Sequence, residues 1–327
     1  MAVKLFIDAI RDALVYEMRQ DDSVFVLGED VGLRGGVFRV TQGMIDEFGA
    51  SRVIDMPLAE SAIVGVAIGA AAYGLKPVAE IQFADFIMPA VNQIISEAAK
   101  MRYRSNGDWS CPLVIRAPFG GGVHGALYHS QSVEALFYHI PGLKVVVPST
   151  AADAKGLLIA ALRDPDPVLY FEHKGLYRLI KDEVPDGEHV VPIGKAAVRR
   201  EGTDITVITY GLMVHYVLEA AEELAHAGIS THVLDLRSLL PLDRDAIIEA
   251  ARRTGKVLIV HEDNKTGGVG AEVSAMIAEE ALYDLDAPIA RLCGPDIPAM
   301  PFSPTMEKFY MLNPAKIADA MRTLAAF

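Results

Sequence analysis

The chain has 327 residues, which is long for one compact core and predicts two domains. A net charge of −13 argues against nucleic acid as a partner. Two cysteines, Cys111 and Cys293, exclude a cysteine-rich disulfide or zinc framework and fit a reducing cytoplasm. The composition is 51% hydrophobic, but the longest apolar run, 63–75, falls well short of the ~20 residues that span a membrane. The apolar surplus therefore predicts large subunit interfaces and no membrane association.

Short apolar strands alternate with longer helical stretches in the first half of the chain. Continuous Val, Ile and Leu runs between helices predict a parallel sheet that helices cover on both faces. The expected strands are 24–27, 77–81, 112–116, 143–147 and 168–172, and the expected helices are 59–74, 85–103 and 151–163.

A polar segment with Pro and Gly, 181–188, interrupts this alternation and is the best candidate for a linker. The alternation then resumes. The expected strands are 205–209, 231–235, 257–260 and 289–292, and the expected helices are 214–226, 243–253, 270–283 and 314–324. The sequence therefore predicts two doubly wound α/β domains, residues 1–185 and 186–327.

Ligands of open parallel sheets bind outside the carboxyl ends of the strands, which directs attention to the loops 28–30, 55–61, 82–86 and 120–132. Glu60 begins a helix rich in Gly and Ala. An acid in the first turn of any helix is stabilised by the helix dipole, so a purely structural role is one interpretation. The apolar residues around Glu60 favour the other interpretation, an acid that can hold and donate a proton.

Two further loops carry side chains suited to a ligand. Gln82 and Phe86 offer an amide and an aromatic face at a strand end, where Phe86 either stacks on a flat heterocycle or packs in the core. The glycine-rich loop 120–132 contains His124 and His129, which suit proton transfer near neutral pH. Their spacing is not that of a helical zinc pair, and a structural turn is the alternative.

Several common signatures are absent. The chain has no GxxxxGK[ST] phosphate loop and no GxSxG elbow, and the glycines at 267–270 give only an incomplete dinucleotide fingerprint. A nicotinamide-dependent dehydrogenase is therefore disfavoured, and a non-catalytic assembly chain is a further alternative.

Several ordered stretches carry a family resemblance: LGEDVG at 27–32, PLAES at 57–61, EIQF at 80–83, GGGVH at 120–124 and HSQS at 129–132. With them, essentially the whole chain resembles the beta subunit of the decarboxylating component of 2-oxo acid dehydrogenase complexes. The resemblance implies a transketolase-like pyrimidine-binding domain followed by a transketolase C-terminal-like domain, with thiamine diphosphate as the cofactor.

The resemblance also implies roles for individual residues. Glu60 matches the glutamate that hydrogen-bonds a ring nitrogen of the cofactor's aminopyrimidine. Gln82 and Phe86 match positions that line this ring, and Glu29 resembles a further acid near it. His129 matches a histidine that faces the substrate and the lipoyl group.

Metal ions and partners are implied in the same way. In the family, the alpha subunit holds the diphosphate and Mg²⁺ through a GDG motif, which this chain lacks. The expected assembly has two alpha and two beta chains and serves a lipoyl-bearing acyltransferase core. A monovalent cation, K⁺, is expected at the backbone carbonyls of Leu113, Val114, Ala161, Asp164 and Asp166.

The stretches 84–90 and 124–131 look most like the branched-chain members of the family. The expected substrate is therefore a small branched 2-oxo acid of the 3-methyl-2-oxobutanoate type. Pyruvate and acetoin dehydrogenases of the same family are the alternatives.

Overall fold

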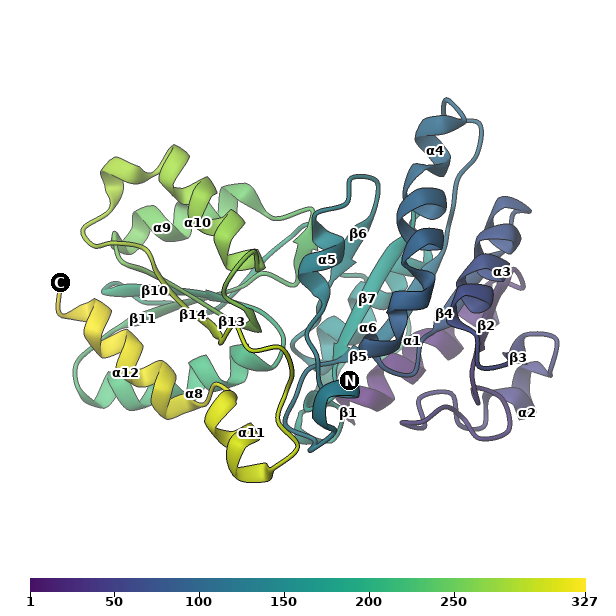
Figure 1. Cartoon of the computed structure of the whole chain (residues 1–327), viewed down its shortest axis with the longest axis horizontal. Coiled ribbons are helices and arrows are strands. Elements are labelled where there is room, and N and C mark those ends of the chain that lie inside the picture. The colour runs from purple at the N-terminus through teal and green to yellow at the C-terminus, as the bar shows by residue number, and fades with distance from the viewer. The chain divides into compact units, whose positions relative to one another are not determined.

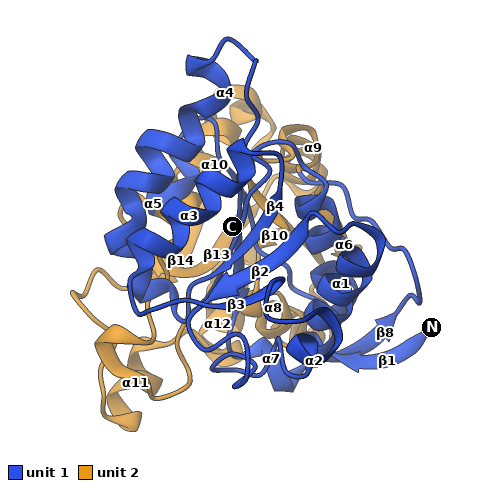
Figure 2. Cartoon of the chain, turned by 90° about the vertical axis from the view of Figure 1, so that its right-hand side faces the viewer, with its two compact units in different colours: residues 1–119, 136–193 blue, residues 120–135, 194–327 orange.

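The computed structural model describes residues 1–327 as two compact units, coloured separately in Figure 2. Unit 1 comprises residues 1–119 and 136–193, and unit 2 comprises 120–135 and 194–327. The observed division between the two units differs from the predicted boundary at 185/186 in two respects. Residues up to Ile193 stay with unit 1 because Val191 packs against Gly156 and donates its N–H to the Gly156 carbonyl at 3.1 Å. The loop 120–135 groups with unit 2 although it lies within the first predicted domain.

Unit 1 is built on a parallel sheet with the strand order β6-β7-β5-β4-β2-β3. Helices α1 and α6 cover one face, and α3 and the helical segment that ends in α4 cover the other (Figure 2). Because both faces are covered, β2, β5 and β7 are buried along their whole length. The strands are β2 (Val24–Gly28), β3 (Val53–Asp55), β4 (Lys76–Glu80), β5 (Val114–Phe119), β6 (Lys144–Val146) and β7 (Val168–His173).

The helices of unit 1 include α1 (Phe6–Gln20), α2 (Met44–Phe48), α3 (Glu60–Ala72), α4 (Met101–Arg104), α6 (Ala151–Leu162) and α7 (Leu176–Leu179), and α5 (Glu134–Tyr138) begins in unit 2. The α3 helix is apolar around most of its circumference, and its buried side holds Ile63, Val64 and Ile68.

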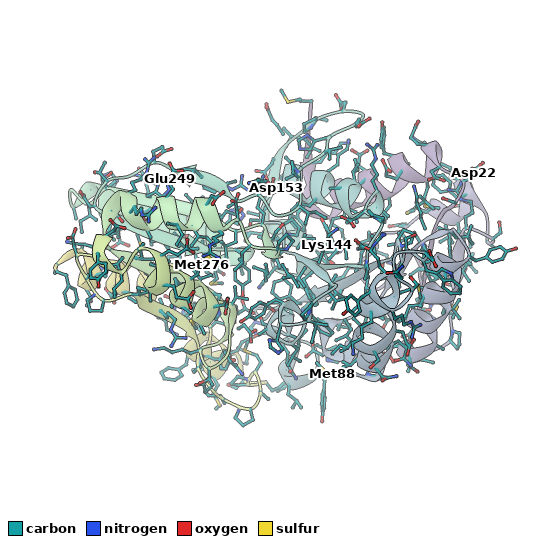
Figure 3. The ribbon with its side chains drawn as sticks, turned by 90° about the horizontal axis from the view of Figure 1, so that it is seen from above. Asp22, Met88, Lys144, Asp153, Glu249 and Met276 are labelled. Carbon is teal, nitrogen blue, oxygen red and sulfur yellow. The ribbon has the colours of Figure 1, made fainter.

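Unit 2 repeats the architecture with the strand order β14-β13-β10-β11-β9, in which only the edge strand β9 is antiparallel. In Figure 1, α9 and α10 lie above this sheet and α8 and α12 lie below it. Figure 3, seen from above, labels Glu249 on α9 and Met276 on α10. The elements are η4 (Ala126–Tyr128), β9 (Ala197–Arg200), β10 (Ile205–Thr209), α8 (Leu212–His226), β11 (Thr231–Asp235), β12 (Ser238–Leu240), α9 (Arg244–Thr254), β13 (Val257–Asn264), α10 (Val269–Glu280), η5 (Leu282–Asp284), β14 (Ala290–Gly294), α11 (Pro304–Tyr310) and α12 (Pro314–Ala325).

The predicted fold class, two doubly wound α/β units, is confirmed, but one local prediction was wrong. The expected helix 85–103 is helical throughout but changes type along its length: η1 (Ala84–Ala90) and η3 (Ala98–Lys100) are 3₁₀, η2 (Gln93–Glu97) is π, and α4 is α-helical. Pro89, within η1, lacks a backbone donor. The expected linker begins as β8 (Lys181–Val184), which pairs antiparallel with β1 (Ala2–Leu5). No helix is both long and apolar enough to cross a bilayer.

The core of unit 1 contains a buried charged cluster that the sequence analysis did not predict. Arg116, in the middle of β5, is fully buried and donates Nη1 to Glu80 Oε2 at 2.7 Å. It binds both carboxylate oxygens of Glu172 on β7, at 2.6 and 2.8 Å. The Tyr177 hydroxyl donates to Glu172 at 2.5 Å. Burial raises the pKa of Glu80, and the opposite charge of Arg116 partly offsets this effect.

Replacing Arg116 by Ala leaves Glu80 and Glu172 buried without their counter-charge. We therefore expect Arg116→Ala to lower the free energy of unfolding by ~3–5 kcal/mol. Arg19→Ala is the control, because Arg19 pairs with Glu47 at the surface and its loss is expected to change stability little. Urea unfolding followed by circular dichroism measures both variants. Equal losses of stability would contradict a structural role for the buried cluster.

Candidate functional site

Unit 1 gathers polar side chains at the carboxyl ends of three neighbouring parallel strands. Glu29 follows β2, Glu60 follows β3 after a short loop, and Gln82 follows β4. Since β4, β2 and β3 are adjacent in the sheet, their carboxyl ends lie at one edge. This edge is where ligands bind in open parallel sheets. The structure therefore brings these three predicted residues to a common edge.

Glu60 is the first residue of α3 and is half-buried. The preceding residue, Ala59, has no side chain that could cap the helix. Glu60 is the only acid in the first turn, where the helix dipole stabilises its carboxylate. Glu29 is also half-buried. Burial raises the pKa of Glu29, and the nearby charges of Asp30 and Glu60 raise it further. Glu29 and Glu60 thus lie within electrostatic range of each other and form a pair of acids.

The loop between β3 and α3 is fixed by short backbone contacts. The N–H of Gly32 donates to Asp55 Oδ1 at 2.6 Å, and the N–H of Met56 donates to the Gly28 carbonyl at 2.8 Å. A Cβ on Gly32 would lie 2.5 Å from an oxygen of Asp55, so glycine lets the backbone approach this carboxylate closely. The turn that leads to Glu60 is therefore held against the loop after β2, which carries Glu29.

Aromatic rings adjoin this edge. Phe86, in η1, packs edge-to-face on Phe83 with ring centroids 5.6 Å apart, and Phe83 packs in turn on Phe38 at 5.3 Å. Phe86 and Gln82 are both half-buried and lie four residues apart on the segment that follows β4. Met88 of the same segment is 41% exposed and lies at the rim of unit 1 in Figure 3. An amide and an aromatic face thus accompany the acid pair.

The predicted histidine, His129, lies in unit 2 in the loop 120–132, directly after η4, and is half-buried. Two acids distant in sequence bind this loop. Glu262 accepts the N–H of Gly121 at 2.6 Å, and Glu307 accepts the N–H groups of Gly122 and His124 at 3.0 and 3.2 Å. Sequence reasoning missed both acids, since nothing in their local pattern relates them to a loop more than 120 positions away.

A polar cavity of about 60 Å³ adjoins the same loop in unit 2. This volume suits a few water molecules and is too small for an organic substrate. Its lining includes Ser130, Ser132, Glu262, Asp263, Asn264 and Tyr310.

A second pair of buried acids lies where the loop ends. Glu134 accepts the hydroxyl of Tyr210 at 2.9 Å, and Asp263 accepts the N–H of Ala135 at 3.4 Å. Burial raises the pKa of Asp263 to about 6 and raises that of Glu134 well above its usual range. Burial thus favours the protonated form of both acids.

No cluster of His, Cys, Asp and Glu side chains could hold a metal ion. The five residues expected to bind a monovalent cation lie at the start of β5, at the end of α6 and in the turn that follows. The carbonyl of Leu113 accepts the N–H of Val168 at 2.9 Å, and that of Ala161 accepts the N–H of Asp164 at 3.2 Å. The Asp164 carboxylate binds Lys144 Nζ at 2.6 Å, and Asp166 binds Arg102 at 2.5 Å. Any cation there would depend on carbonyl oxygens, because both carboxylates already have cationic partners.

Comparison with known proteins also gives two domains, although the first match includes residues 120–135, which the structure groups with unit 2. Residues 5–180 match the family model "Transketolase, pyrimidine binding domain", and residues 194–317 match "Transketolase, C-terminal domain". Among solved structures, a split-gene transketolase described as an inactive beta4 tetramer superposes with a TM-score of 0.80 at 25% identity and covers 99% of each chain.

Curated relatives are similar over the full length. The chain is 68% identical to the 2-oxoisovalerate dehydrogenase subunit beta of Bacillus subtilis (strain 168), and 48% identical to the pyruvate dehydrogenase E1 component subunit beta of the same strain, with 100% of each chain covered in both comparisons. It is 47% identical to the mitochondrial 2-oxoisovalerate dehydrogenase subunit beta 2 of Arabidopsis thaliana over 96% of this chain and 87% of that one. With two transketolase-type domains in this order and such identities over its whole length, the chain belongs to the family of 2-oxo acid dehydrogenase beta subunits.

Proposed function

We propose that the chain is the beta subunit of a thiamine-diphosphate-dependent component that decarboxylates branched-chain 2-oxo acids and transfers the acyl unit to a lipoyl group. One observation carries the choice of substrate class. Identity to the 2-oxoisovalerate dehydrogenase beta subunit is 68%, against 48% to the pyruvate dehydrogenase beta subunit of the same bacterial strain. Pyruvate is the second candidate, because that relative also covers the whole chain.

The donor set in unit 1 fits the aminopyrimidine half of thiamine diphosphate. A flat heteroaromatic ring with a basic nitrogen is complementary to a carboxylic acid, an amide and an aromatic face. Glu60, Gln82 and Phe86 supply these three groups at the ligand-binding edge of the sheet. When bound, the cofactor would supply a nucleophilic carbon for attack on the 2-oxo group and would take up the electron pair of the C–C bond that breaks as CO₂ leaves.

The residues of the chain have distinct tasks in this proposal. Glu60 shares a proton with a ring nitrogen of the pyrimidine and so controls the protonation of the ring. Glu29, whose pKa burial raises, is a second acid within electrostatic range of Glu60, and in its protonated form it limits the negative charge at this edge. His129 exchanges a proton with the substrate or the lipoyl group.

The partners belong to the same proposal. An alpha subunit that binds the diphosphate and Mg²⁺ accounts for the missing GDG motif, in a tetramer of two alpha and two beta chains that serves a lipoyl-bearing acyltransferase core. An apolar hollow of about 580 Å³ in unit 1, lined in part by Ile95, Tyr103 and Ile140, supports a subunit interface there. The free thiols of Cys111 and Cys293 are consistent with the cytoplasm. The last part of the proposal is a K⁺ ion bound by the backbone carbonyls of Leu113, Val114, Ala161, Asp164 and Asp166.

Replacing Glu60 by Gln removes the proton that the proposed mechanism needs while keeping the size of the side chain. We expect Glu60→Gln to lower the decarboxylation rate of the alpha–beta complex by roughly 10²–10⁴-fold. Glu272→Gln is the matched control, because Glu272 is an exposed acid in the first turn of α10. If Glu60→Gln retained full activity, Glu60 would be an ordinary helix-start acid.

Substrate choice is tested by measuring decarboxylation of 3-methyl-2-oxobutanoate and pyruvate side by side with the reconstituted complex. We expect kcat/KM to favour the branched substrate by roughly 10–200-fold, which is the range that added methyl groups provide in an apolar pocket. A preference for pyruvate would replace the first candidate by the second.

The dependence on a second chain is tested by calorimetry with thiamine diphosphate and Mg²⁺. We expect the purified chain to bind the cofactor much more weakly than the alpha–beta complex does, because the chain lacks the diphosphate-binding motif. Micromolar affinity of the isolated chain would contradict this division of the site.

A further inference from the structure

The loop that bears His129 contains several residues in left-handed backbone conformations. His124 and Ala126 both adopt positive φ angles of 56°, a left-handed conformation that costs energy in residues other than glycine. Gly120 and Gly122, at φ angles of 87° and 82°, also adopt left-handed conformations. Such a loop keeps one geometry only where surrounding groups hold it. The relevant contacts all come from unit 2 itself.

Glu307 supplies the most extensive of these contacts. It lies on α11, is 1% exposed, and uses both carboxylate oxygens. Oε1 accepts the N–H groups of Gly122 and His124, and Oε2 binds the ring Nδ1 of His124. Hydrogen bonds to a charged carboxylate are about twice as strong as neutral ones. One side chain therefore fixes both the backbone and the ring of the turn at 122–124.

This turn is in direct contact with His129 through a glycine. A Cβ on Gly125 would lie 2.7 Å from the Cβ of His129 and 3.0 Å from its carbonyl oxygen. The backbone of Gly125 thus packs against the base of His129, with no side chain between them. A movement of His124 displaces Gly125, and the position of the His129 ring changes with it.

The ends of the loop are closed by separate contacts. The N–H of Gly120 donates to the Gln131 carbonyl at 3.1 Å, and Gly121 donates to Glu262 at 2.6 Å. A Cβ on Gly121 would lie 2.6 Å from Met300 Cε and 2.8 Å from Met311 Sδ, so the Gly121 backbone packs closely against these two buried methionines. Between these ends, Glu307 binds the turn at 122–124, and the Gln131 amide donates to the Leu127 carbonyl at 2.7 Å.

We infer that Glu307 is a positioning residue for His129, and that its carboxylate holds the turn at 122–124 and, through Gly125, sets where the His129 imidazole meets the substrate or the lipoyl group. The inference rests on the proposed role of His129. It assigns to α11 a part in the reaction although Glu307 itself does not touch the reacting atoms.

The first test measures the loop independently of activity. Hydrogen exchange of the amides of Gly122 and His124 is followed in the alpha–beta complex for the native chain, Glu307→Ala and Glu307→Gln. We expect Glu307→Ala to lose protection at both amides and Glu307→Gln, which keeps one acceptor oxygen, to retain part of it. Glu279→Ala, which removes an exposed acid of α10, is the control. Unchanged protection in Glu307→Ala would overturn the inference.

The second test is a double-mutant cycle on acyl transfer to a lipoylated acceptor domain. We expect Glu307→Ala to lower kcat by roughly 10²-fold with little change in KM, since a displacement of about 1 Å has this effect on a catalytic group. In the His129→Ala background, the same substitution is expected to have almost no further effect. An equal loss in both backgrounds would overturn the inference, because Glu307 would then act independently of His129.

The two tests also separate this inference from the proposed function. If His129→Ala alone left acyl transfer unchanged, the role proposed for His129 would be wrong. The positioning role inferred for Glu307 would then be wrong as well. The exchange measurement would still establish whether Glu307 holds the turn. Loss of protection together with a dependence of the Glu307→Ala effect on His129 is the combination that supports the inference.

Discussion

The cluster of Arg116 with Glu80 and Glu172 is the constraint on which the architecture of unit 1 depends. Three charges that are almost completely removed from water tolerate only one arrangement, because each carboxylate needs the guanidinium and the guanidinium needs both. Glu80, Arg116 and Glu172 belong to the neighbouring strands β4, β5 and β7. The cluster therefore links these three strands in the register that the sheet adopts.

The candidate site begins where this cluster ends. Glu80 is the last residue of β4, and Gln82 follows two positions later. Gly36 lies so close to Glu80 that a Cβ there would be 2.8 Å from the carboxylate, which joins the loop after β2 to the same cluster. The loops that carry Glu29 and Gln82 thus rest on a rigid charged core. Rigid support of this kind keeps an acid and an aromatic face at fixed positions for a ligand.

Unit 2 uses carboxylates in a different way. Glu262 and Glu307 bind backbone N–H groups of a glycine-rich loop rather than cationic side chains. A loop rich in positive φ angles points its N–H groups inward, and an anion is the natural partner for such a set of donors. The loop with His129 is therefore held by charge-assisted hydrogen bonds from elements that lie far away in the sequence.

The sequence by itself determined the two α/β units, most strands and helices, and the loops that follow the strands. Apolar runs and glycine-rich turns are local patterns, which is why they can be recognised without the structure. Glu60, Gln82 and His129 were predicted in this way and through the family resemblance. Only the tertiary structure decided the partners of Arg116, the limits of the two units, and the mixture of helix types over 84–104. The hydrogen bonds from the turn at 122–124 to Glu307 could not be predicted from the sequence either, because they join residues more than 180 positions apart. These features depend on which side chains meet in space, and such meetings leave no periodicity in the chain.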